Sequence, residues 1–414
     1  MAQELGRVVF TRDRYARSWS LGDRKNPISK TPVLMQLAGD PEMESFLSPF
    51  SSKTDTKIPS TLSISSKVAL SPPDFSENGP NFESFIGHVL PPSLEEANAG
   101  ESAGSGQLLP VSWQRLSHDK ELLDSNLNPS IIVLVDSVQL ASQPGKLVKA
   151  IHVLKNKFPG SLLWTPGIGG PDNAAVLNWF GVDIFDLSRS RMCNSAGVIL
   201  SENGPRMPDD SMNESATMDV QIQHWKQSIG SIKSNLKNGT LRALVDKQSL
   251  NSPHLVEHLR AHDKICSNQI GLLSSHVDNE KVLDCSSPNT LNDPVVKEWC
   301  EFISNQYIAP KGLDNVLILL PCSARKPYRL SKSHGRFIRA INSNSCHEVM
   351  VTSPLGLVPR DLEEIWPASH YDIPVTGDWT NDEFIRTQTM LESLLARHNY
   401  NLVINHSGRK LETG

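Results

Sequence analysis

The residues best suited to chemistry lie in one short segment, Leu320–His334, which reads LPCSARKPYRLSKSH. Cys322 stands there directly after an apolar run and before a series of positively charged residues. The cations are Arg325, Lys326, Arg329, Lys332, Arg336 and Arg339. No acidic residue lies between Asp314 and Glu348. A thiol in a cationic setting has a lowered pKa and forms more of the nucleophilic thiolate, so we predict that Cys322 is a nucleophile.

Other side chains of the same segment are able to move or donate protons. His334 can relay protons if the segment folds back toward the thiol. Tyr328, Ser331 and Ser333 add hydroxyl donors, and the cationic surface also suits a phosphate backbone. The spacing leaves a second interpretation open, in which Cys322 is a small buried hydrophobe and the cations form a solvated face.

The elements around this segment alternate between strands and helices. The sequence predicts strands at Val316–Leu320, Glu348–Thr352, Ile373–Thr376 and Leu402–Ile404, and helices at Ser333–Ile341 and Asp382–His398. This alternation predicts a parallel sheet, in which ligands bind outside the carboxyl ends of the strands. Cys322 falls at such an end. Asp378 follows a later strand and is predicted, with Glu363 as the alternative, to hold an amino group of a substrate.

An earlier part of the chain shows the same alternation. Strands are predicted at Ile131–Val135, Leu162–Trp164 and Val182–Phe185, and helices at Lys146–Lys157 and Asp172–Phe180. Strands separated by helices indicate a parallel α/β sheet or barrel. The length of 414 residues is too large for one small core. We therefore predict two domains, 1–275 and 276–414.

Composition and charge limit the class of protein. Apolar residues make up 38% and charged residues 21%, which is typical of a soluble globular protein. A net charge of −5 is unusual for a chain that binds a long nucleic acid by itself, so either the ligand is small, or the basic surface is local, or another chain supplies much of the binding. The first residues lack a secretory apolar region, and no apolar run approaches the roughly 18 residues of a membrane span. These features predict a cytoplasmic protein with no membrane contact.

Cysteine and histidine spacing gives little indication of metal. The six cysteines include no CxxC pair, so we expect free thiols, no disulfide framework and no bound metal. His254, Glu257 and His258 match the short HxxEH pattern of some zinc proteases, and His262 continues the four-residue spacing. Because Pro253 suits the first position of a helix, we predict an ordinary helix there. Residues Asp219–Lys237 predict another helix, ended by Asn238-Gly239.

The segment around Cys322 fits the pattern PC–x3–KPY–x2–S–x2–H, with seven defined positions in fourteen residues. This pattern resembles the signature of the archaeosine synthases, the lysine transferases of archaea that are related to tRNA-guanine transglycosylases. The front of the chain is similar to transglycosylases over the Gly-rich turn Pro166–Pro171 and the stretch Gly181–Asp186. The resemblance implies a transglycosylase-like (β/α)8 barrel, followed by a small doubly wound α/β catalytic domain.

The front part departs from the transglycosylase pattern in two respects. Asp186 occupies the position of the aspartate that attacks ribose in active transglycosylases, but the sequence context after it differs, and the CxC–x2–C zinc cluster is missing. We therefore expect a degenerate barrel that binds tRNA, base or partner without exchanging the base. Asp186 is expected to be a structural carboxylate or a substrate-binding one.

The reaction implied by the resemblance acts on tRNA that carries 7-cyano-7-deazaguanine (preQ0) at position 15. The ε-amine of free lysine adds to the nitrile and gives an amidine, with no other cofactor. Thiolate attack by Cys322 would give a thioimidate that the amine displaces. The predicted catalytic residues are Cys322, Lys326, Tyr328, Ser331 and His334. The predicted substrate-binding residues are Ser323, Arg325, Ser333, Asp186 and Asp378.

Partners and alternative activities complete the predictions from sequence. A radical-SAM enzyme is implied as the next in the reaction series, and tRNA as the substrate. Because full-length relatives carry an RNA-binding PUA domain, this chain is predicted to be the alpha subunit of a split enzyme, working in an oligomer. The alternatives are an active transglycosylase with Asp186 as its nucleophile, a non-catalytic tRNA-binding subunit and, more remotely, a cysteine hydrolase.

Overall fold

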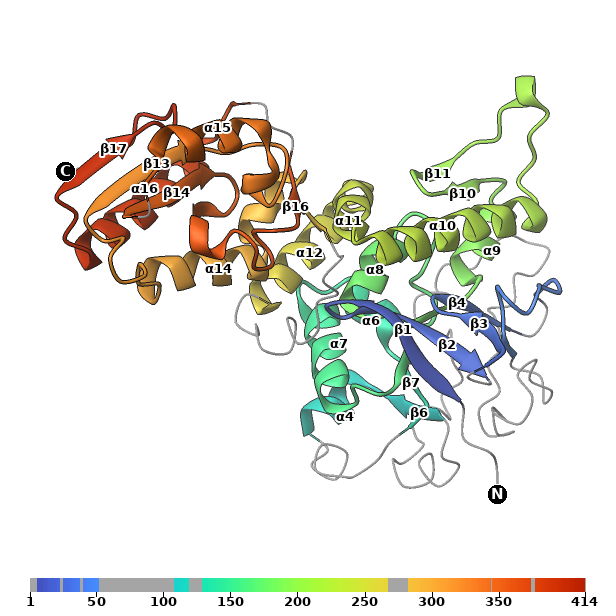
Figure 1. Cartoon of the computed structure of the whole chain (residues 1–414). Coiled ribbons are helices and arrows are strands. Elements are labelled where there is room, and N and C mark those ends of the chain that lie inside the picture. The colour runs from blue at the N-terminus through green and yellow to red at the C-terminus, as the bar shows by residue number, and fades with distance from the viewer. Residues whose placement is uncertain are drawn as a thin grey trace. The chain divides into compact units, whose positions relative to one another are not determined.

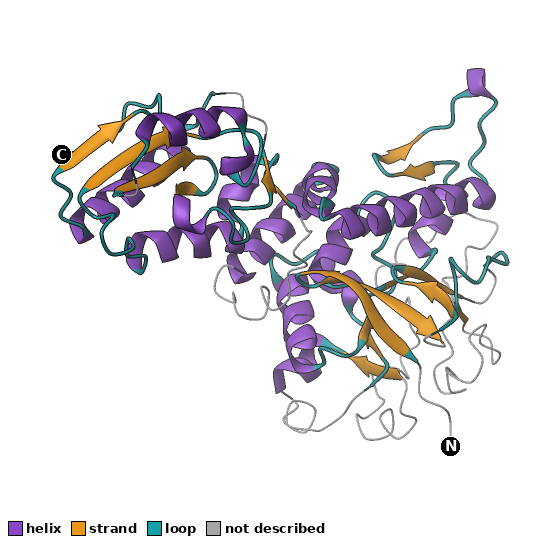
Figure 2. Ribbon diagram, viewed as in Figure 1, coloured by secondary structure: helices purple, strands orange, loops and turns teal. Residues whose placement is uncertain are grey.

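A computed structural model describes residues 6–22, 25–37, 40–51, 108–118, 129–266, 282–343, 345–373 and 377–413. The chain divides into two compact units, unit 1 (Met1–His262) and unit 2 (Asp263–Gly414). The boundary predicted between residues 275 and 276 lies outside the described residues. Each unit combines helices with strands, so the prediction of an α/β protein is confirmed (Figures 1 and 2).

Unit 1 contains two larger sheets. A six-stranded sheet is parallel throughout, with the spatial order β5 (Phe50–Ser51), β4 (Val33–Gln36), β9 (Ile184–Phe185), β8 (Leu162–Trp164), β7 (Ile131–Leu134) and β6 (Leu108–Val111). An antiparallel sheet has the order β1 (Arg7–Asp13), β2 (Ala16–Gly22) and β3 (Pro27–Lys30). The parallel strands are short, and their described side chains are buried, as continuous apolar runs predict.

The two sheets share one core. Trp19 and Leu21 of β2 form a single buried cluster with side chains of β4, β7, β8 and β9, including Val33, Ile131 and Trp164. Within the described residues no pairing joins β5 to β6, and the chain between these two edge strands includes 52–107, outside the described part. The closed (β/α)8 barrel therefore stays a prediction, whereas the parallel α/β sheet is observed.

Helices and a hairpin make up the rest of unit 1. The helices are α4 (Trp113–His118), α6 (Ser137–Ala141), α7 (Lys146–Lys157), α8 (Ala174–Phe180), α9 (Ser188–Ser195), α10 (Met218–Asn238), α11 (Leu241–Ser249) and α12 (Pro253–Cys266), which runs past the end of the unit. The hairpin pairs β10 (Ile199–Ser201) with β11 (Gly204–Arg206) and leads into η1 (Asp210–Met212). Helix α10 ends at Gly239, whose φ of 76° suits glycine, as the sequence predicts.

Unit 2 is built on a four-stranded sheet in the order β15 (Gly356–Pro359), β14 (Cys346–Thr352), β13 (Val316–Pro321) and β17 (Leu402–Asn405). Strand β13 is parallel to β14 and to β17, and β15 is an antiparallel edge strand. The chain leaves β13 toward β14 on one side and later returns to β17 on the other side. The strand order thus reverses at β13, which marks the place where ligands bind in doubly wound folds.

The helices of unit 2 begin at clear capping residues. They are α14 (Pro294–Asn305), α15 (Lys332–Ile341) and α16 (Asn381–Arg397). Asp293 caps α14 ahead of a proline, and Ser331 caps α15. Thr380 and Glu383 form a reciprocal capping box at the start of α16. Shorter elements are β12 (Leu283–Asp284), β16 (Tyr371–Asp372), η2 (Pro288–Asn292), η3 (Tyr328–Leu330) and η4 (Arg360–Leu362).

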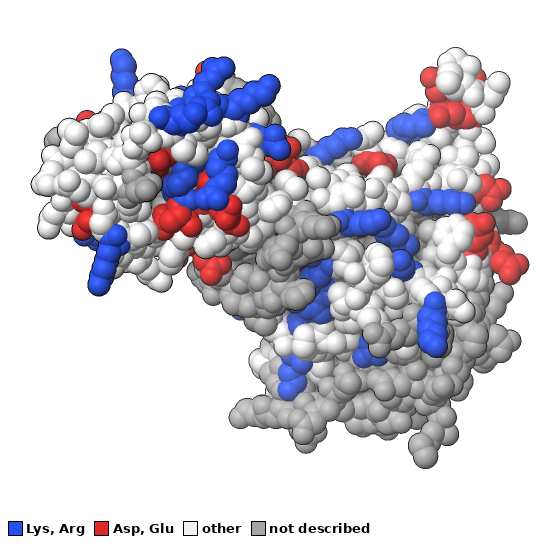
Figure 3. All heavy atoms as spheres, in the orientation of Figure 1, with Lys and Arg blue, Asp and Glu red and all other residues white. Residues whose placement is uncertain are grey.

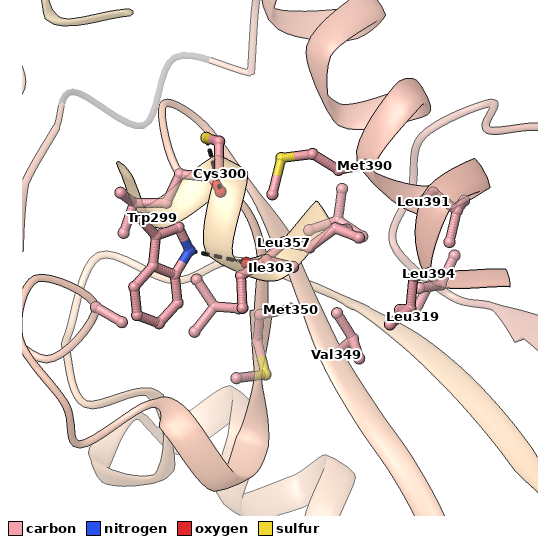
Figure 4. Packing of buried hydrophobic residues seen from close by; sticks show 14 of the residues in the cluster. Trp299, Cys300, Ile303, Leu319, Val349, Met350, Leu357, Met390, Leu391 and Leu394 are labelled. Atoms are coloured by element: carbon pink, nitrogen blue, oxygen red, sulfur yellow. Dashed lines mark hydrogen bonds between the residues drawn. The ribbon is translucent and has the colours of Figure 1, made fainter. Parts of the chain in front are cut away.

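The core of unit 2 lies between the sheet and helices α14 and α16, which lie side by side (Figure 1). Figure 4 shows Met390, Leu391 and Leu394 of α16 packed with strand residues, while the Trp299 indole donates a hydrogen bond of 3.1 Å to the carbonyl of Leu357. This core fixes the strand ends that carry the site. Among the described residues, no helix has both the length and the apolar character needed to cross a bilayer.

Candidate functional site

A pocket of about 370 Å³ lies at the carboxyl ends of the parallel strands of unit 2. Cys322 follows β13, Ser353 follows β14, and Arg409 lies in the turn after β17; all three line the pocket. Further walls come from 285–291, from Ile373 and from 377–383. Because parallel strands end at the same edge of a sheet, residues far apart in the sequence meet here.

The Cys322 thiol is half-buried and lines this pocket. The side chain also packs against the core of unit 2, so the thiol is partly core-packed and partly open to the pocket. Lys326 does not line the pocket, but its charge interacts with Cys322, and its Nζ lies 4.0 Å from the centroid of the Tyr371 ring. Burial lowers the pKa of Lys326, while the neighbouring Cys322 and Asp372 oppose this shift. A partly buried ammonium with a lowered pKa both stabilises a nearby thiolate and donates a proton more readily.

Tyr328 belongs to a buried chain of hydroxyl groups. Its hydroxyl shares a short hydrogen bond with the Tyr371 hydroxyl, which in turn lies 2.6 Å from Thr352 Oγ1. Both tyrosines are buried, and burial raises the pKa of each. The chain joins η3 to the ends of β14 and β16. Tyr328 does not line the pocket, so its contacts indicate a positioning role rather than direct proton donation.

His334 supports the turn that carries Cys322. Its Nε2 donates to the carbonyl of Pro321 at 3.0 Å, and its Nδ1 accepts from Arg360 Nη2 at 3.1 Å. Burial, with the charge of Arg360, lowers the pKa of His334 to about 4. Both ring nitrogens of a fully buried neutral imidazole are thus occupied. We interpret His334 as a positioning residue rather than as the proton relay predicted from the sequence.

The cationic segment is partly neutralised by acids from elsewhere in the chain. The Arg329 side chain contacts Glu363 Oε1 at 2.9 Å and Glu364 Oε1 at 3.0 Å. Arg360 contacts Glu363 at 3.0 Å and Glu348 at 2.6 Å. Glu363 is completely buried by these partners and does not line the pocket, which removes it as a substrate ligand. The acid-free sequence interval therefore does not give an acid-free environment.

A basic surface remains beside the site. The exposed cations of α15 and of the turn before it are Arg325, Lys332, Arg336 and Arg339. Figure 3 shows blue side chains gathered over the region of α15. Ser323 donates to the carbonyl of Arg325 at 3.0 Å, and the hydroxyls of Ser331 and Ser333 lie 3.1 Å apart. Neither these serines nor Arg325 line the pocket. Substrate binding by Ser323, Arg325 and Ser333 therefore stays a prediction.

The pocket contains groups that the sequence did not single out. Cys285, Trp379, Glu383 and Arg409 line it, together with the predicted Asp378. Burial, with nearby acids, raises the pKa of the Cys285 thiol well above its usual value. Cys285 is therefore a poor nucleophile beside the half-exposed Cys322.

Asp186 occupies a different place, in unit 1 at the end of β9. Its Oδ2 accepts from Trp164 Nε1 at 3.1 Å and from the amide of Gly167 at 3.0 Å. Its Oδ1 accepts from the amide of Ser188 at 2.9 Å. The carboxylate is 1% exposed and does not line the pocket around Cys322. These contacts indicate the structural role and give no support for the predicted substrate-binding role.

We expect Asp186→Asn to lower the free energy of unfolding by about 1–3 kcal/mol, because an amide group would face donors that now meet an oxygen. Urea denaturation checks this value, with the exposed Asp210→Asn as the control. An unchanged stability together with loss of labelled-guanine exchange would instead identify Asp186 as a transglycosylase nucleophile.

The histidines of the HxxEH pattern do not converge on one point. His254 is exposed and lies 3.8 Å from Glu257. His258 donates to the carbonyl of Ala141 at 2.9 Å. His262 Nδ1 lies 3.0 Å from His152 Nε2, so these two rings share a hydrogen bond. The predicted helix is observed as α12.

Buried neutral histidines predict sensitivity to acid. Burial lowers the pKa of His152, His334 and His347 to about 4. In the unfolded chain each pKa lies near 6.5, so their contribution is complete above pH 6.5 and is lost as the pH falls toward 4. For His152 and His347 we expect each residue to account for a loss of up to about 2 kcal/mol in the free energy of unfolding as the pH falls from 6.5 to 5. Chemical denaturation at several pH values gives the free energy of unfolding as a function of pH. This free energy should depend less steeply on pH in His152→Gln than in wild type, and as steeply as in wild type in His254→Ala. An equal pH dependence in wild type and both variants would contradict the assignment of His152 as a buried neutral histidine.

Comparison with known proteins gives the wider context. Residues 296–413 match the family model described as "Domain of unknown function (DUF5591)", which covers the sheet and pocket residues from β13 to β17. The chain is 32% identical to the archaeosine synthase subunit alpha of Thermoplasma acidophilum over 296 residues, which is 69% of this chain and 54% of the relative.

Two further relatives match longer stretches. The archaeosine synthase subunit alpha of Methanosarcina acetivorans is 27% identical over 418 aligned residues, which is 94% of this chain and 63% of the relative. The tRNA-guanine(15) transglycosylase of Methanobrevibacter smithii is 24% identical over 351 residues, which is 76% of this chain and 50% of the relative. The chain thus spans about half to two thirds of the length of these relatives. The resemblance predicted from the motif around Cys322 is confirmed: the chain is a relative of the archaeosine synthases and contains a DUF5591 domain.

Proposed function

We propose that this chain takes part in archaeosine formation by transferring lysine to the nitrile of preQ0 in tRNA, with Cys322 as the nucleophile. The observation that carries this proposal is the position of Cys322. Its half-buried thiol lines a pocket where three strands end, and the charge of Lys326 interacts with it. The names of the archaeosine synthase relatives support the pathway. The geometry supports the chemistry, because a thiol needs both access and a stabilising charge.

The first step forms a carbon–sulfur bond. The Cys322 thiolate attacks the electrophilic nitrile carbon, and one carbon–nitrogen π bond breaks. The nitrogen gains a proton, for which the Lys326 ammonium is the most suitable donor in the segment, since burial lowers its pKa. The product is a thioimidate, and the thiolate charge is consumed as the proton is transferred. No oxidant, reductant or nucleotide is required.

The second step replaces sulfur by nitrogen. The neutral ε-amine of lysine adds to the thioimidate carbon, and the carbon–sulfur bond breaks as the amidine forms. The amine proton returns to the neutral Lys326 or to the departing thiolate, so that the enzyme is restored. Splitting one difficult addition into two easier steps is the general benefit of covalent catalysis. Pro321 and His334 contribute by holding the turn that presents the sulfur.

Unit 1 and the partners have supporting roles in this proposal. The parallel sheet of unit 1 and the similarity to a transglycosylase favour a degenerate (β/α)8 barrel that binds tRNA without base exchange. A second subunit with a PUA domain would supply further RNA contacts in an oligomer. The relatives named as subunit alpha favour such an arrangement. A radical-SAM enzyme would act on the lysine adduct, and the reaction would take place in the cytoplasm.

Mass spectrometry of the tRNA tests this function directly. The full chain, alone and with the second subunit, is incubated with preQ0-containing tRNA and L-lysine, and the tRNA is digested to nucleosides. The expected product is the preQ0 nucleoside plus one complete lysine, because addition to a nitrile loses no atoms. Incorporation of labelled guanine without lysine addition would instead favour a transglycosylase, and neither product would favour a non-catalytic subunit.

A further inference from the structure

We infer that Arg409, Glu383 and Asp378 form a subsite that binds the α-amino-acid end of a cationic amino acid and directs its side-chain amine toward Cys322. This inference rests on the proposed function and adds to it the residues that select the amino-acid substrate. The three charged residues and Cys322 line the same pocket. Its volume of about 370 Å³ is in the range of small-molecule sites.

Arg409 is held in the pocket wall and forms no direct ion pair among the described residues, although its charge acts on the nearby Glu383. Its guanidinium carbon lies 4.2 Å from the centroid of the Trp379 ring, and Nη1 donates to the carbonyl of Gly377 at 2.8 Å. None of the ion pairs found within the described residues involves Arg409, in contrast to the paired Arg329 and Arg360. A fixed, planar guanidinium that forms no direct ion pair is suited to a two-point hydrogen bond with the carboxylate of a ligand.

Glu383 supplies a negative charge in the same pocket. Its Oε2 accepts from the amide and hydroxyl of Thr380 at 2.6 and 2.9 Å, and its Oε1 accepts from the Ser353 hydroxyl. Burial opposes ionisation, but the hydrogen bonds from Ser353 and Thr380 outweigh it and lower the pKa of Glu383. The carboxylate is therefore charged and fixed in position. Asp378 adds a second carboxylate at the more exposed side.

The charges of the pocket complement those of lysine. Arg409 with Glu383 and Asp378 gives a sum of one positive and two negative charges, whereas lysine carries one negative and two positive charges before its ε-amine loses a proton. The lining also contains the apolar side chains Leu291 and Ile373, which suit a methylene stem. A ligand with one carboxylate, one α-ammonium and an aliphatic stem thus matches the basic, acidic and apolar parts of the pocket lining.

The strand order sets the direction of the ligand. Arg409 follows β17 and Cys322 follows β13, and these two strands are paired neighbours. A carboxylate held by Arg409 places the opposite end of the molecule toward the β13 side, where the thiol lies. The reacting amine is then presented to the carbon that is bound to sulfur. An amine without a carboxylate would lack this orientation. We therefore expect the pocket to bind lysine more tightly than an amine that has no α-carboxylate.

Isothermal titration of the full chain with L-lysine and with cadaverine, which lacks the carboxylate, tests the subsite. Wild-type protein should bind lysine at least about 30-fold more tightly than cadaverine, since a charge-assisted pair is lost. Arg409→Met should weaken lysine binding by a similar factor and leave cadaverine binding unchanged, so that the preference disappears. Arg409→Lys should restore part of it. Lys410→Met, an exposed neighbouring cation that does not line the pocket, is the matched control and should bind like wild type.

Two outcomes separate this inference from the proposed function. If lysine binds with the Arg409-dependent preference but no lysine reaches the tRNA, the subsite is supported and the transfer function fails. If lysine is transferred but Arg409→Met keeps the wild-type preference for lysine over cadaverine in KM, the subsite is overturned and the function stands. Because Glu383 also caps α16, Asp378→Asn is the safer variant of the acidic side, and wild-type lysine affinity in it would overturn the role of Asp378.

Discussion

Replacing Cys322 with alanine should abolish lysine transfer and leave the fold unchanged. Without the sulfur no thioimidate forms, and loss of a covalent nucleophile commonly reduces kcat by about 10³-fold or more. The thiol is half-buried at a pocket wall, so its removal leaves no cavity in the core. Single-turnover transfer to preQ0-containing tRNA measures the loss, and thermal unfolding verifies that the variant is folded. We expect a difference in unfolding free energy below about 1 kcal/mol.

Cys346→Ala provides the matched control, because Cys346 is also half-buried in unit 2 but does not line the pocket. It should transfer lysine at the wild-type rate. Incubation of wild-type protein with substrate tRNA in the absence of lysine should give a covalent protein–RNA adduct that added lysine releases. Full transfer by the Cys322→Ala variant would exclude the thioimidate route.

Replacing Lys155 with methionine should cause the largest loss of stability in unit 1. Lys155 Nζ lies 2.9 Å from Asp183 Oδ2, and the two side chains are 2% and 0% exposed. The same oxygen accepts from the amide of Leu163 at 2.9 Å. Breaking a buried ion pair from one side leaves an uncompensated charge and costs about 3–5 kcal/mol. Urea denaturation of the full chain measures the change in the transition of unit 1.

The double variant Lys155→Met with Asp183→Asn separates charge from packing. It should recover part of the lost stability, because the orphaned charge is removed while the acceptor for Leu163 remains. Lys146→Met, at an exposed position of the same helix, should stay within about 0.5 kcal/mol of wild type. A loss below about 1 kcal/mol in Lys155→Met would mean that water or local rearrangement already compensates the carboxylate.

The strand and helix pattern was the part most readily predicted from sequence. The helix at Lys146–Lys157 and the strand at Leu162–Trp164 are observed with the predicted limits, because clear apolar periodicity and glycine or proline neighbours define them. The helix predicted from Ser333 begins one residue earlier, after its cap Ser331. The antiparallel edge strand β15 was not predicted. It is only four residues long and begins shortly after Ser353-Pro354, so the sequence there resembles a turn. Part of the strand predicted at Ile373–Thr376 lies outside the described residues.

The sequence predicted that Cys322 lies at a strand end, where it lines the pocket, but it did not predict the surroundings of this residue. Cys322 was found because a buried strand run ends directly before it. The acids that neutralise Arg329 come from residues 363 and 364, and sequence distance gave no sign of that pairing. Glu383 was visible only as part of a capping pattern. Glu383 and Arg409 both line the pocket only because of the order of the strands in the sheet. Local sequence periodicity does not reveal that order.

The arrangement of the pocket walls has a consequence for biosynthesis of the protein. Chain growth from the amino end exposes the thiol at residue 322 long before residue 409 leaves the ribosome. Because β17 pairs with β13 and carries Arg409 in the turn after it, the last wall is added only when this strand docks. A nascent chain that ends before β17 would therefore present the Cys322 thiol without the Arg409 wall of the pocket. In the proposed subsite, selectivity for lysine would therefore appear late in synthesis, in a single step, when β17 joins the sheet.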